Sequence, residues 1–379
     1  MMDFLNLKPV VFGLDVSDLS LKIIKLKRRR RFLSLASFGE TEIKPGIIEK
    51  GEIKSEKEFL QVLKEALNKV KGERLKTHNV IVSLPEKKAF FTVIQMPRMK
   101  EEELQSAVPF EAENHIPLPI EEVYLDFQII PPVQDHLDHF DILLACFPRN
   151  IINIYVSCLK KAGLDLYALE IESQSISRAL IKNGLSPFPI LIVDFGRSVT
   201  NFIIFSGYSI RFTASTPISS FQLNQAISKS LGVDLKEAEK MKIKYGLELT
   251  EDRERSKTKS NSKEEKITRK DIFESMAPVL SDLTDQIKKY INYYQTHSCH
   301  EHLSVKKEGI EKIILCGKGA NLKGLANFLS LFLEMPVELG NPWTNILPDP
   351  LREVPELPFG ESLGYTTALG LALRGIKEE

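Results

Sequence analysis

The chain has 379 residues, 43% hydrophobic and 27% charged, and its 51 basic and 51 acidic residues give a formal net charge of zero. This length predicts two lobes of roughly 150 to 200 residues each, and the charge balance argues against non-specific nucleic-acid binding, which needs a basic surplus. No run of about 18 apolar residues is present and the N-terminus is too polar for a secretory signal, so we expect a cytoplasmic protein. The four cysteines form no C-x-x-C pair and should be small core residues: Cys146, Cys158, Cys299 and Cys316.

The first expected element is a pair of strands interrupted by a polar turn, within residues 10–27. Apolar residues lead into Asp15, the chain turns through Ser17, and apolar residues resume at Leu21. Such turns leave backbone N–H groups pointing outward and hydroxyls add donors, so the tip of the hairpin suits phosphate oxygens. The aspartate could then position Mg²⁺ or a water, because that ion prefers oxygen ligands. Taken alone, the pattern also fits a plain β-hairpin whose Asp and Ser satisfy the turn.

The segment at about 84–165 is expected to form a small inserted subdomain. Its expected elements are a strand at 89–95, a helix that begins after Pro97, strands at 123–130 and 141–147, and a helix with its apolar face at 151–162. Pro109 should bend or end the first helix, because it removes an N–H bond. The acids of that helix fit a solvated face or, alternatively, a contact with a basic partner: Glu101, Glu102, Glu103, Glu111 and Glu113.

The strand–acid–turn–strand pattern returns at 190–205. There an apolar strand again runs into an acid, Asp194, and the chain turns through Gly196 before a second strand begins. Two copies so far apart predict two related lobes, 1–188 and 189–379.

The remaining second half predicts helices and a late glycine turn. Helices are expected at 235–245 and 272–297, on either side of a charged, mobile loop at about 250–270. Residues 312–333 read as a strand, a turn and a helix. That turn holds two glycines, which let a backbone approach a ligand closely: Gly317 and Gly319.

Two charged or metal-like runs are open to more than one interpretation. The run KRRRR at 27–31 fits a solvated hairpin turn or a contact with an anionic membrane surface. The run HSCHEH at 297–302 invites a metal site, but its spacing matches no standard zinc pattern and a polar helix end explains it.

The two hairpins and the glycine turn together resemble the two phosphate motifs and the adenosine motif of the actin-like ATPase superfamily. More closely, the chain resembles the PilM family of type IV pilus assembly proteins, relatives of the cell-division protein FtsA, over about residues 10–374. The most family-specific portions are 96–130, 164–180 and 231–247. The resemblance implies an α/β fold of two lobes, each built on a ribonuclease-H-like sheet, with a nucleotide in the cleft between them and the inserted subdomain serving interactions.

The resemblance also implies which residues hold the nucleotide. Carried over by position, these are Asp15, Ser17 and Ser20 in the first phosphate loop, Asp194, Gly196, Ser198 and Thr200 in the second, Gly317 and Gly319 in the adenosine turn, and Glu239 and Lys242 near the adenosine. The implied cofactors are ATP and Mg²⁺, with Asp15 and Asp194 on the metal side, and no catalytic residue is assigned. Small residues spaced four apart resemble the crossing hinge helices of the superfamily: Ser173 and Ser177, and Gly364, Ala368 and Ala372.

Several positions depart from the family pattern. Ser17 replaces a glycine of the first loop, Asp18 should add a negative charge beside the phosphates, Ser219 and Ser220 replace a Gly-Gly pair, and Lys318 replaces the middle glycine of the adenosine turn. An added Cβ costs backbone contact and an added carboxylate repels phosphate. We therefore expect nucleotide binding rather than turnover, at most a weak ATPase, with a nucleotide-free scaffold as the alternative.

The resemblance implies a pilus scaffold recruited to the inner face of the cytoplasmic membrane without spanning it. Its expected partner is the cytoplasmic tail of an inner-membrane pilus protein, PilN, with pilus motor ATPases and self-association as further expectations and no nucleic acid. One alternative is an FtsA-like division protein that polymerises at the membrane, which the short stretch after Arg374 disfavours because no amphipathic tail follows. Another is a phosphotransferase like the sugar and acetate kinases, for which the sequence provides no catalytic base.

Overall fold

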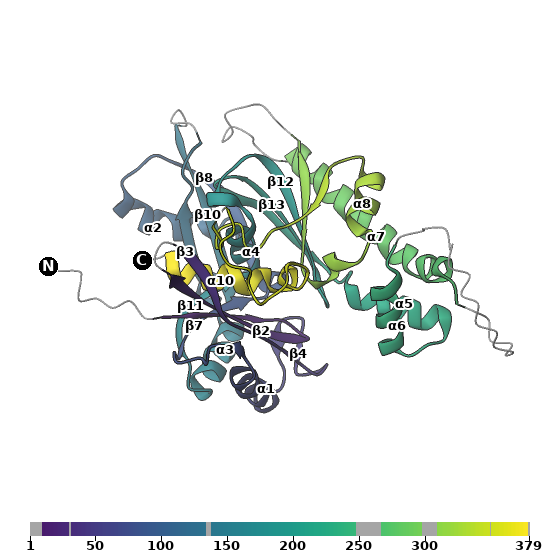
Figure 1. Cartoon of the computed structure of the whole chain (residues 1–379). Helices are drawn as coiled ribbons and strands as arrows, with labels where there is room; N and C mark the ends of the chain where they lie inside the picture. The colour runs from purple at the N-terminus through teal and green to yellow at the C-terminus, as the bar shows by residue number, and fades with distance from the viewer. Residues whose placement is uncertain are drawn as a thin grey trace, which may run out of the picture.

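Two α/β lobes, each built on a mixed sheet, lie on either side of a pair of crossing helices (Figure 1). The structure is a computed structural model and describes residues 10–29, 32–133, 138–247, 267–297, 309–348 and 350–377. The first lobe has a six-stranded sheet in the order β11-β7-β1-β2-β3-β6, and the second has a five-stranded sheet in the order β14-β13-β12-β15-β16. Each sheet therefore contains an antiparallel hairpin of the kind that the sequence indicated, at 12–29 in the first lobe and at 186–207 in the second.

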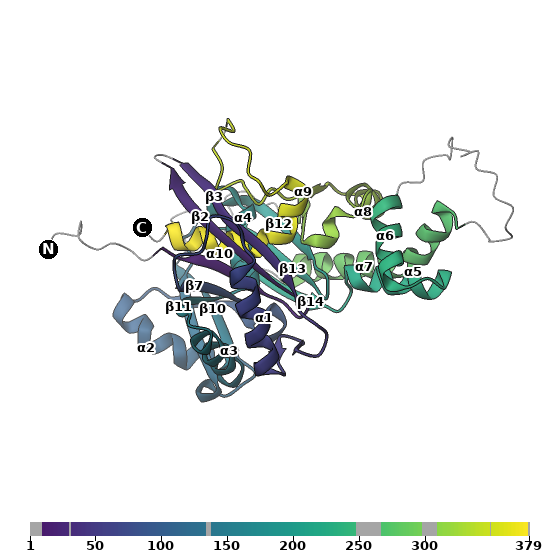
Figure 2. The same ribbon diagram turned by 60° about the horizontal axis from the view of Figure 1, so that its bottom comes forward.

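Helices cover both faces of the first sheet. Its strands are β1 (Phe12–Val16), β2 (Ser20–Arg29), β3 (Phe32–Glu42), β6 (Lys71–Gly72), β7 (Asn79–Leu84) and β11 (Asp165–Ile171), with a short β4 (Ile48–Glu49) and β5 (Glu52–Ile53) pair beside it. Helices α1 (Glu56–Asn68) and α3 (Arg149–Lys161) lie on one face of the sheet (Figure 2). There Phe12, Leu14, Phe59 and Tyr155 belong to one buried core. The C-terminal helix covers the other face.

The inserted subdomain has its own sheet and core. Strands β8 (Phe90–Pro97), β9 (Val123–Ile129) and β10 (His139–Pro148) pair in the antiparallel order β8-β10-β9, and helix α2 (Glu101–Ala112) packs Leu104 and Val108 against Ile142 and Leu144. The helix continues through Pro109 and ends at Ala112, so the alternative in which it stops early is wrong. Helix α3, predicted as the last element of the insert, packs instead in the core of the first lobe.

The second lobe repeats the plan of a sheet covered by helices. Its elements are β12 (Ser186–Phe195), β13 (Thr200–Gly207), β14 (Ser209–Thr216), α5 (Ser220–Leu231), α6 (Leu235–Tyr245), α7 (Arg269–His297), β15 (Lys312–Cys316), α8 (Leu325–Leu333), β16 (Val337–Leu339) and α9 (Phe359–Ser362). Leu191, Phe202, Met276 and Leu280 join the sheet to α7 in one core. The predicted helix at 235–245 and the predicted strand–turn–helix at 312–333 are confirmed.

Helices α4 (Glu172–Leu180) and α10 (Thr366–Lys377) cross between the lobes (Figure 1). The close approach lies at Gly370, where an added Cβ would overlap the carbonyl oxygen of Ser175. On the other side of α10, a Cβ on Gly13 would lie 2.5 Å from the carbonyl oxygen of Ala368, so strand β1 is pressed onto the same helix. The two helices do cross, but their close approach is at Ser175 and Gly370, which were not among the predicted small residues. Ala368 and Ala372 pack in a core with β2 and β3, and Gly364 lies in a 3-10 turn, Leu363–Tyr365, before α10 begins.

Some expectations concern residues outside the described ranges. These are the charged loop up to residue 266, Arg30 and Arg31 of the basic run, and residues 298–302 of the histidine-rich run with its Cys299. The other three cysteines are buried, as predicted. Among the described residues, no helix is long and apolar enough to cross a bilayer.

Candidate nucleotide site

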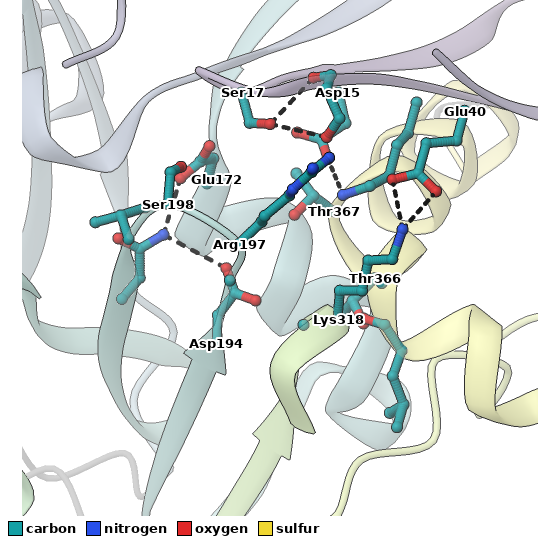
Figure 3. A pocket seen from close by; sticks show the side chains of 18 residues that line it. Asp15, Ser17, Glu40, Glu172, Asp194, Arg197, Ser198, Lys318, Thr366 and Thr367 are labelled. Atoms are coloured by element: carbon teal, nitrogen blue, oxygen red, sulfur yellow. Dashed lines mark hydrogen bonds and ion pairs between the residues drawn. The ribbon is translucent and has the colours of Figure 1, made fainter. Parts of the chain in front are cut away.

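A cleft between the lobes brings both hairpin tips and the glycine turn together (Figure 3). Helices α4 and α10 begin at its base, contributing Glu172, Thr366 and Thr367. Seven residues predicted from the sequence line it: Asp15, Ser17, Ser20, Asp194, Gly196, Ser198 and Gly317. The sheet topology explains this convergence, because β1 and β12 occupy corresponding positions in the two sheets and each ends at the cleft.

The first hairpin closes tightly and leaves Asp15 at its base. The Ser17 N–H donates to the Ser20 carbonyl at 3.0 Å, and the two serine hydroxyl oxygens lie 3.0 Å apart. The Asp15 carboxylate is 5% exposed; it accepts from Ser83 Oγ at 3.0 Å and lies 3.6 Å from Lys22 Nζ. Ser83 also receives the Val16 N–H at 2.8 Å, which fixes the hydroxyl that orients the carboxylate.

The second hairpin requires glycine at its turn. The Gly196 N–H donates to the Val199 carbonyl at 3.0 Å, and a Cβ on Gly196 would lie 2.5 Å from that oxygen. Asp194 lies just before this turn, with Asn201 Nδ2 at 3.5 Å from its Oδ2. Gly317 has φ +82°, a conformation that side chains rarely adopt, and a Cβ there would overlap Asp194 Oδ1. The glycine turn therefore packs its backbone directly onto the second hairpin.

Glu172 is a cleft residue that the sequence analysis missed. It is the first residue of α4, it is 7% exposed, and its Oε2 accepts from Asn201 Nδ2 at 2.9 Å and from the Glu86 N–H at 3.4 Å. A signal was available, because Glu172 directly follows the apolar end of β11, and Asp15 is likewise near the end of the apolar strand β1. The sheet order places β11, β7 and β1 side by side, so these acids emerge at one edge.

Burial and neighbouring carboxylate charge raise the pKa values of two of the cleft carboxylates, Asp194 and Glu172. Burial raises the pKa of Asp194 to about 6. The Lys22 cation opposes this increase, and the Asp15 charge adds to it. Burial, followed by the charges of Asp15 and Asp194, raises the pKa of Glu172 well above its usual range. A cation would relieve this repulsion, since nearby positive charge favours the ionised form.

The donor set fits Mg²⁺ carried on phosphate groups. Among the described residues, no group of three or more His, Cys, Asp and Glu side chains is placed to hold a metal by itself. Mg²⁺ is commonly held by one or two carboxylates together with phosphate oxygens and waters. Asp15 and Asp194, at the ends of facing strands, fit that arrangement and would orient the ion on the phosphates.

Four of the predicted residues lie outside the lining of the cleft. Thr200 is fully buried and its hydroxyl donates to the Ile218 carbonyl at 2.7 Å, so it is committed to the fold. Gly319 packs on Phe195, whose ring would lie 2.6 Å from an added Cβ.

The other two lie on helix α6. Lys242 donates to the Ser220 hydroxyl at 2.7 Å, and burial lowers its pKa to about 8. Glu239 is partly exposed one turn away, and its charge opposes that lowering. Lys242 therefore lies next to the start of α5, and neither it nor Glu239 lines the cleft.

The departures from the family pattern have structural partners. The Asp18 carboxylate accepts from the N–H groups of Lys50 at 3.0 Å and Gly51 at 2.8 Å, so it satisfies a neighbouring loop. Asp18 is also absent from the residues that line the cleft, so its carboxylate is engaged by this loop and not by the cleft surface. Ser219 caps α5 by accepting from the Gln222 N–H at 3.4 Å.

Two ion pairs cross the cleft and reduce its free space. Arg197 NH1 lies 2.8 Å from Glu42 Oε1, and Lys318 Nζ lies 3.0 Å from Glu40 Oε2. The cavity that remains is about 50 Å³, whereas ligand pockets commonly measure about 300 to 1,000 Å³. A nucleotide would therefore need these side chains to move.

A family comparison agrees with this geometry. The model of the family "Type IV pilus assembly protein PilM" matches residues 13–376. The chain belongs to the PilM family. Among solved structures, the PilM-PilN type IV pilus biogenesis complex matches with a TM-score of 0.76 and 23% identity, covering 97% of this chain and 99% of that chain.

More distant relatives place the PilM fold among actin-like proteins. MreB5 of Spiroplasma citri bound to ADP matches with a TM-score of 0.52 and 13% identity, covering 97% of this chain and 95% of that chain. The cell-division protein FtsA of Pseudomonas aeruginosa is 24% identical over 223 residues, which cover 59% of this chain and 50% of FtsA. FtsA of Helicobacter pylori strain J99 is 28% identical over 200 residues, which cover 51% of this chain and 40% of FtsA. The chain thus spans about half or less of these curated relatives, and the predicted two-lobed actin-like fold is confirmed.

Proposed function

We propose that this chain is a cytoplasmic nucleotide-binding scaffold of type IV pilus assembly, which docks the tail of a PilN-like inner-membrane protein. The observation that carries the nucleotide part is the meeting of two strand–Asp–turn hairpins, with Asp15 and Asp194 facing one cleft from different lobes. Family membership over residues 13–376 supports the pilus part. The MreB5 relative is bound to ADP, which supports a nucleotide in the corresponding cleft.

In this proposal the residues divide the work of binding Mg-ATP. Backbone N–H groups and hydroxyls at the two hairpin tips, including Ser17 and Ser198, would hold phosphate oxygens. Asp15 and Asp194 would hold Mg²⁺, which neutralises phosphate charge when it is bound. Glu172 lines the same cleft and is close enough to feel the charges of both. In this proposal it would orient a water, and weak hydrolysis is the most turnover that we propose.

A thermal-shift titration tests nucleotide binding. Mg-ATP or Mg-ADP at about a hundred times its Kd should add about 2.7 kcal/mol to the free energy of unfolding and raise Tm by several degrees. Asp194→Asn should lose this shift, whereas Asp126→Asn, an exposed acid on β9 of the insert, should keep it. No shift in the unmodified chain would contradict the nucleotide site and leave a docking scaffold.

For the PilN-like tail we propose a groove beside the inserted subdomain. A cavity of about 600 Å³ lies between β8 of the insert and β14 and α7 of the second lobe, lined by Phe90, Phe91, Phe212 and Tyr293. Both β8 and β14 are edge strands of their sheets. An extended peptide with apolar anchors suits a groove with aromatic walls and free strand edges.

A peptide titration tests the docking. A synthetic tail peptide of a PilN-like protein should bind the full chain, and Phe212→Ala with Tyr293→Ala should weaken binding at least about tenfold. The control is Tyr208→Ala, an exposed ring in the β13–β14 turn that does not line the groove. No binding of the unmodified chain at high micromolar peptide would count against docking, and unchanged affinity in the groove variant would place the peptide elsewhere. Motor ATPases and self-association remain further proposals for partners.

A further inference from the structure

Two acids of strand β3 hold the two cations that project from the nucleotide loops of the second lobe. Arg197 follows Gly196 at the tip of the second hairpin, and Lys318 follows Gly317 in the glycine turn. Arg197 pairs with Glu42. Lys318 contacts both carboxylate oxygens of Glu40, at 3.0 and 3.1 Å (Figure 3). Each pair therefore joins a phosphate or adenosine loop of one lobe to a strand of the other.

The register of β3 places these acids beside the first hairpin. Glu40 lies opposite Lys22 and Glu42 lies opposite Ser20 in the β2–β3 ladder. Directly opposite residues of an antiparallel pair project from the same face. Lys22 and Ser20 both line the cleft, so the two glutamates reach its rim from the side on which the phosphates would lie.

The carboxylates of Glu42 and Glu40 offer Arg197 and Lys318 the same kind of negatively charged oxygen acceptor that a phosphate group would offer. Guanidinium and ammonium groups bind carboxylates and phosphates through the same charge-assisted hydrogen bonds. A nucleotide seated between the hairpins would bring its phosphates to the loops that carry both cations. The glutamates and the phosphates would then compete for the same donors.

We propose that Arg197 and Lys318 are phosphate-recognising residues of this chain and that Glu42 and Glu40 compete for them, so nucleotide binding exchanges ion-pair partners across the cleft. The inference rests on the proposed nucleotide site and assigns to it an internal competitor. It also assigns phosphate recognition to Lys318, which replaces a glycine of the family pattern.

The exposure of the pairs fits exchange rather than permanent bridging. The side chains of Arg197 and Glu42 are 31% and 76% exposed, and those of Lys318 and Glu40 are 51% and 23% exposed. Ion pairs so open to water are weak. A polyphosphate carries more negative charge than one carboxylate and can accept from both cations at once, so it should displace both glutamates.

Calorimetric titration of the full chain and its variants with Mg-ATP and Mg-ADP tests the exchange, because the direction in which each variant changes affinity is predicted. Glu40→Gln/Glu42→Gln should bind either nucleotide about 3- to 10-fold more tightly, because two weak competing pairs are removed. Arg197→Gln/Lys318→Gln should bind it at least about tenfold more weakly. If the ion pairs only hold the two lobes together, both double variants should change nucleotide affinity in the same direction. If the glutamates compete with phosphate, the two double variants should change it in opposite directions.

The control variant makes the same change in net charge as Glu40→Gln/Glu42→Gln and also removes two ion pairs, but away from the cleft. Glu56→Gln/Glu65→Gln removes two exposed acids of α1 that pair with Lys161 and Lys69, away from the cleft, and its affinity should stay within about twofold of the unmodified chain. The Tm of each variant without nucleotide confirms folding.

Each result decides between the two proposals. Binding by the unmodified chain with unchanged or weaker binding by Glu40→Gln/Glu42→Gln would overturn the exchange and keep the nucleotide site. Binding by that variant alone would support the exchange and show that the glutamates close the cleft. No binding by either would overturn the nucleotide site and the exchange together.

Discussion

Three carboxylates dominate the residue-level electrostatics of the cleft: Asp15, Glu172 and Asp194. Two of them have raised pKa values because charge is packed where little water reaches it. Such an arrangement costs stability in the absence of a bound cation and favours cation binding, a compromise common at functional sites.

The first prediction concerns Asp194 and pH. Its folded-state pKa of about 6 lies above the usual 3.8, so the folded state binds the proton more tightly than the unfolded chain. The resulting stabilisation is present below pH 4 and is lost as pH rises through 6. Without nucleotide, Asp194→Asn should therefore be more stable than the unmodified chain at pH 7, by about 1–2 kcal/mol, and the difference should shrink at pH 4. Denaturant unfolding at both pH values measures it, and a constant difference would contradict the shift.

The second prediction separates binding from turnover at Glu172. Glu172→Gln keeps the size of the side chain and the acceptor for Asn201, so affinity for Mg-ATP should change by less than about threefold. Any ATP hydrolysis by the unmodified chain should fall by at least about 100-fold, because a water-orienting carboxylate is lost. Phosphate release by purified protein measures this, and hydrolysis at the original rate in the variant would remove Glu172 from the mechanism.

At the scale of elements, the crossing of α4 and α10 supports the cleft from below. Both helices contribute residues to it, and α10 is also pressed against β1 by Gly13. Strand β1 carries Asp15 and α4 carries Glu172, so the spacing of this crossing sets how two of the three carboxylates face each other.

The third prediction tests that spacing. Gly370→Ala would gain about 1 kcal/mol of helix propensity, but its Cβ would overlap the Ser175 carbonyl oxygen, and overpacking costs about 1–3 kcal/mol or more. We expect a net loss of stability, seen as a lower Tm. In the control, Gly364→Ala, the new Cβ meets Lys318 at 3.5 Å, an ordinary contact. Equal Tm values for the two variants would show that the helices separate at little cost.

At the scale of the whole molecule, a buried ion pair connects the insert to the second lobe. Arg211 NH1 of β14 lies 2.6 Å from Asp141 Oδ2 of β10, and the two side chains are 9% and 8% exposed. His139 Nε2 lies 3.5 Å from the other Asp141 oxygen. Both residues line the proposed peptide groove, so a docked peptide would lie beside this contact between the insert and the second lobe.

The fourth prediction concerns this pair. Arg211→Leu should lower the free energy of unfolding by about 3 kcal/mol, because Asp141 would be left buried without its main partner. The double variant Arg211→Leu/Asp141→Leu should recover most of that loss, since an apolar pair of similar volume replaces the ions. Denaturant unfolding of the three proteins measures the coupling, and additive losses would contradict it.

Much of the fold was predictable because its signals are local. Apolar runs into Asp15 and Asp194 indicated the two hairpins, and apolar positions at helical spacing after the turn at Gly317 and Gly319 indicated the helix within 312–333. These patterns depend on residues within a few positions of one another, which a sequence displays directly.

The remaining features depend on contacts between distant segments. Glu172 lies in the cleft because β11 is next to β7, which is next to β1, in the sheet. The Asp18 carboxylate accepts hydrogen bonds from the backbone N–H groups of Lys50 and Gly51. Arg197 pairs with Glu42, which is 155 positions away in the chain. The sequence by itself determined the two hairpins and the acids Asp15 and Asp194 within them, because strand and turn preferences are set by neighbouring residues. Only the tertiary structure decided which acids share the cleft, where the hinge helices touch and that the chain's own ion pairs occupy the rim, because each requires two folded lobes brought face to face.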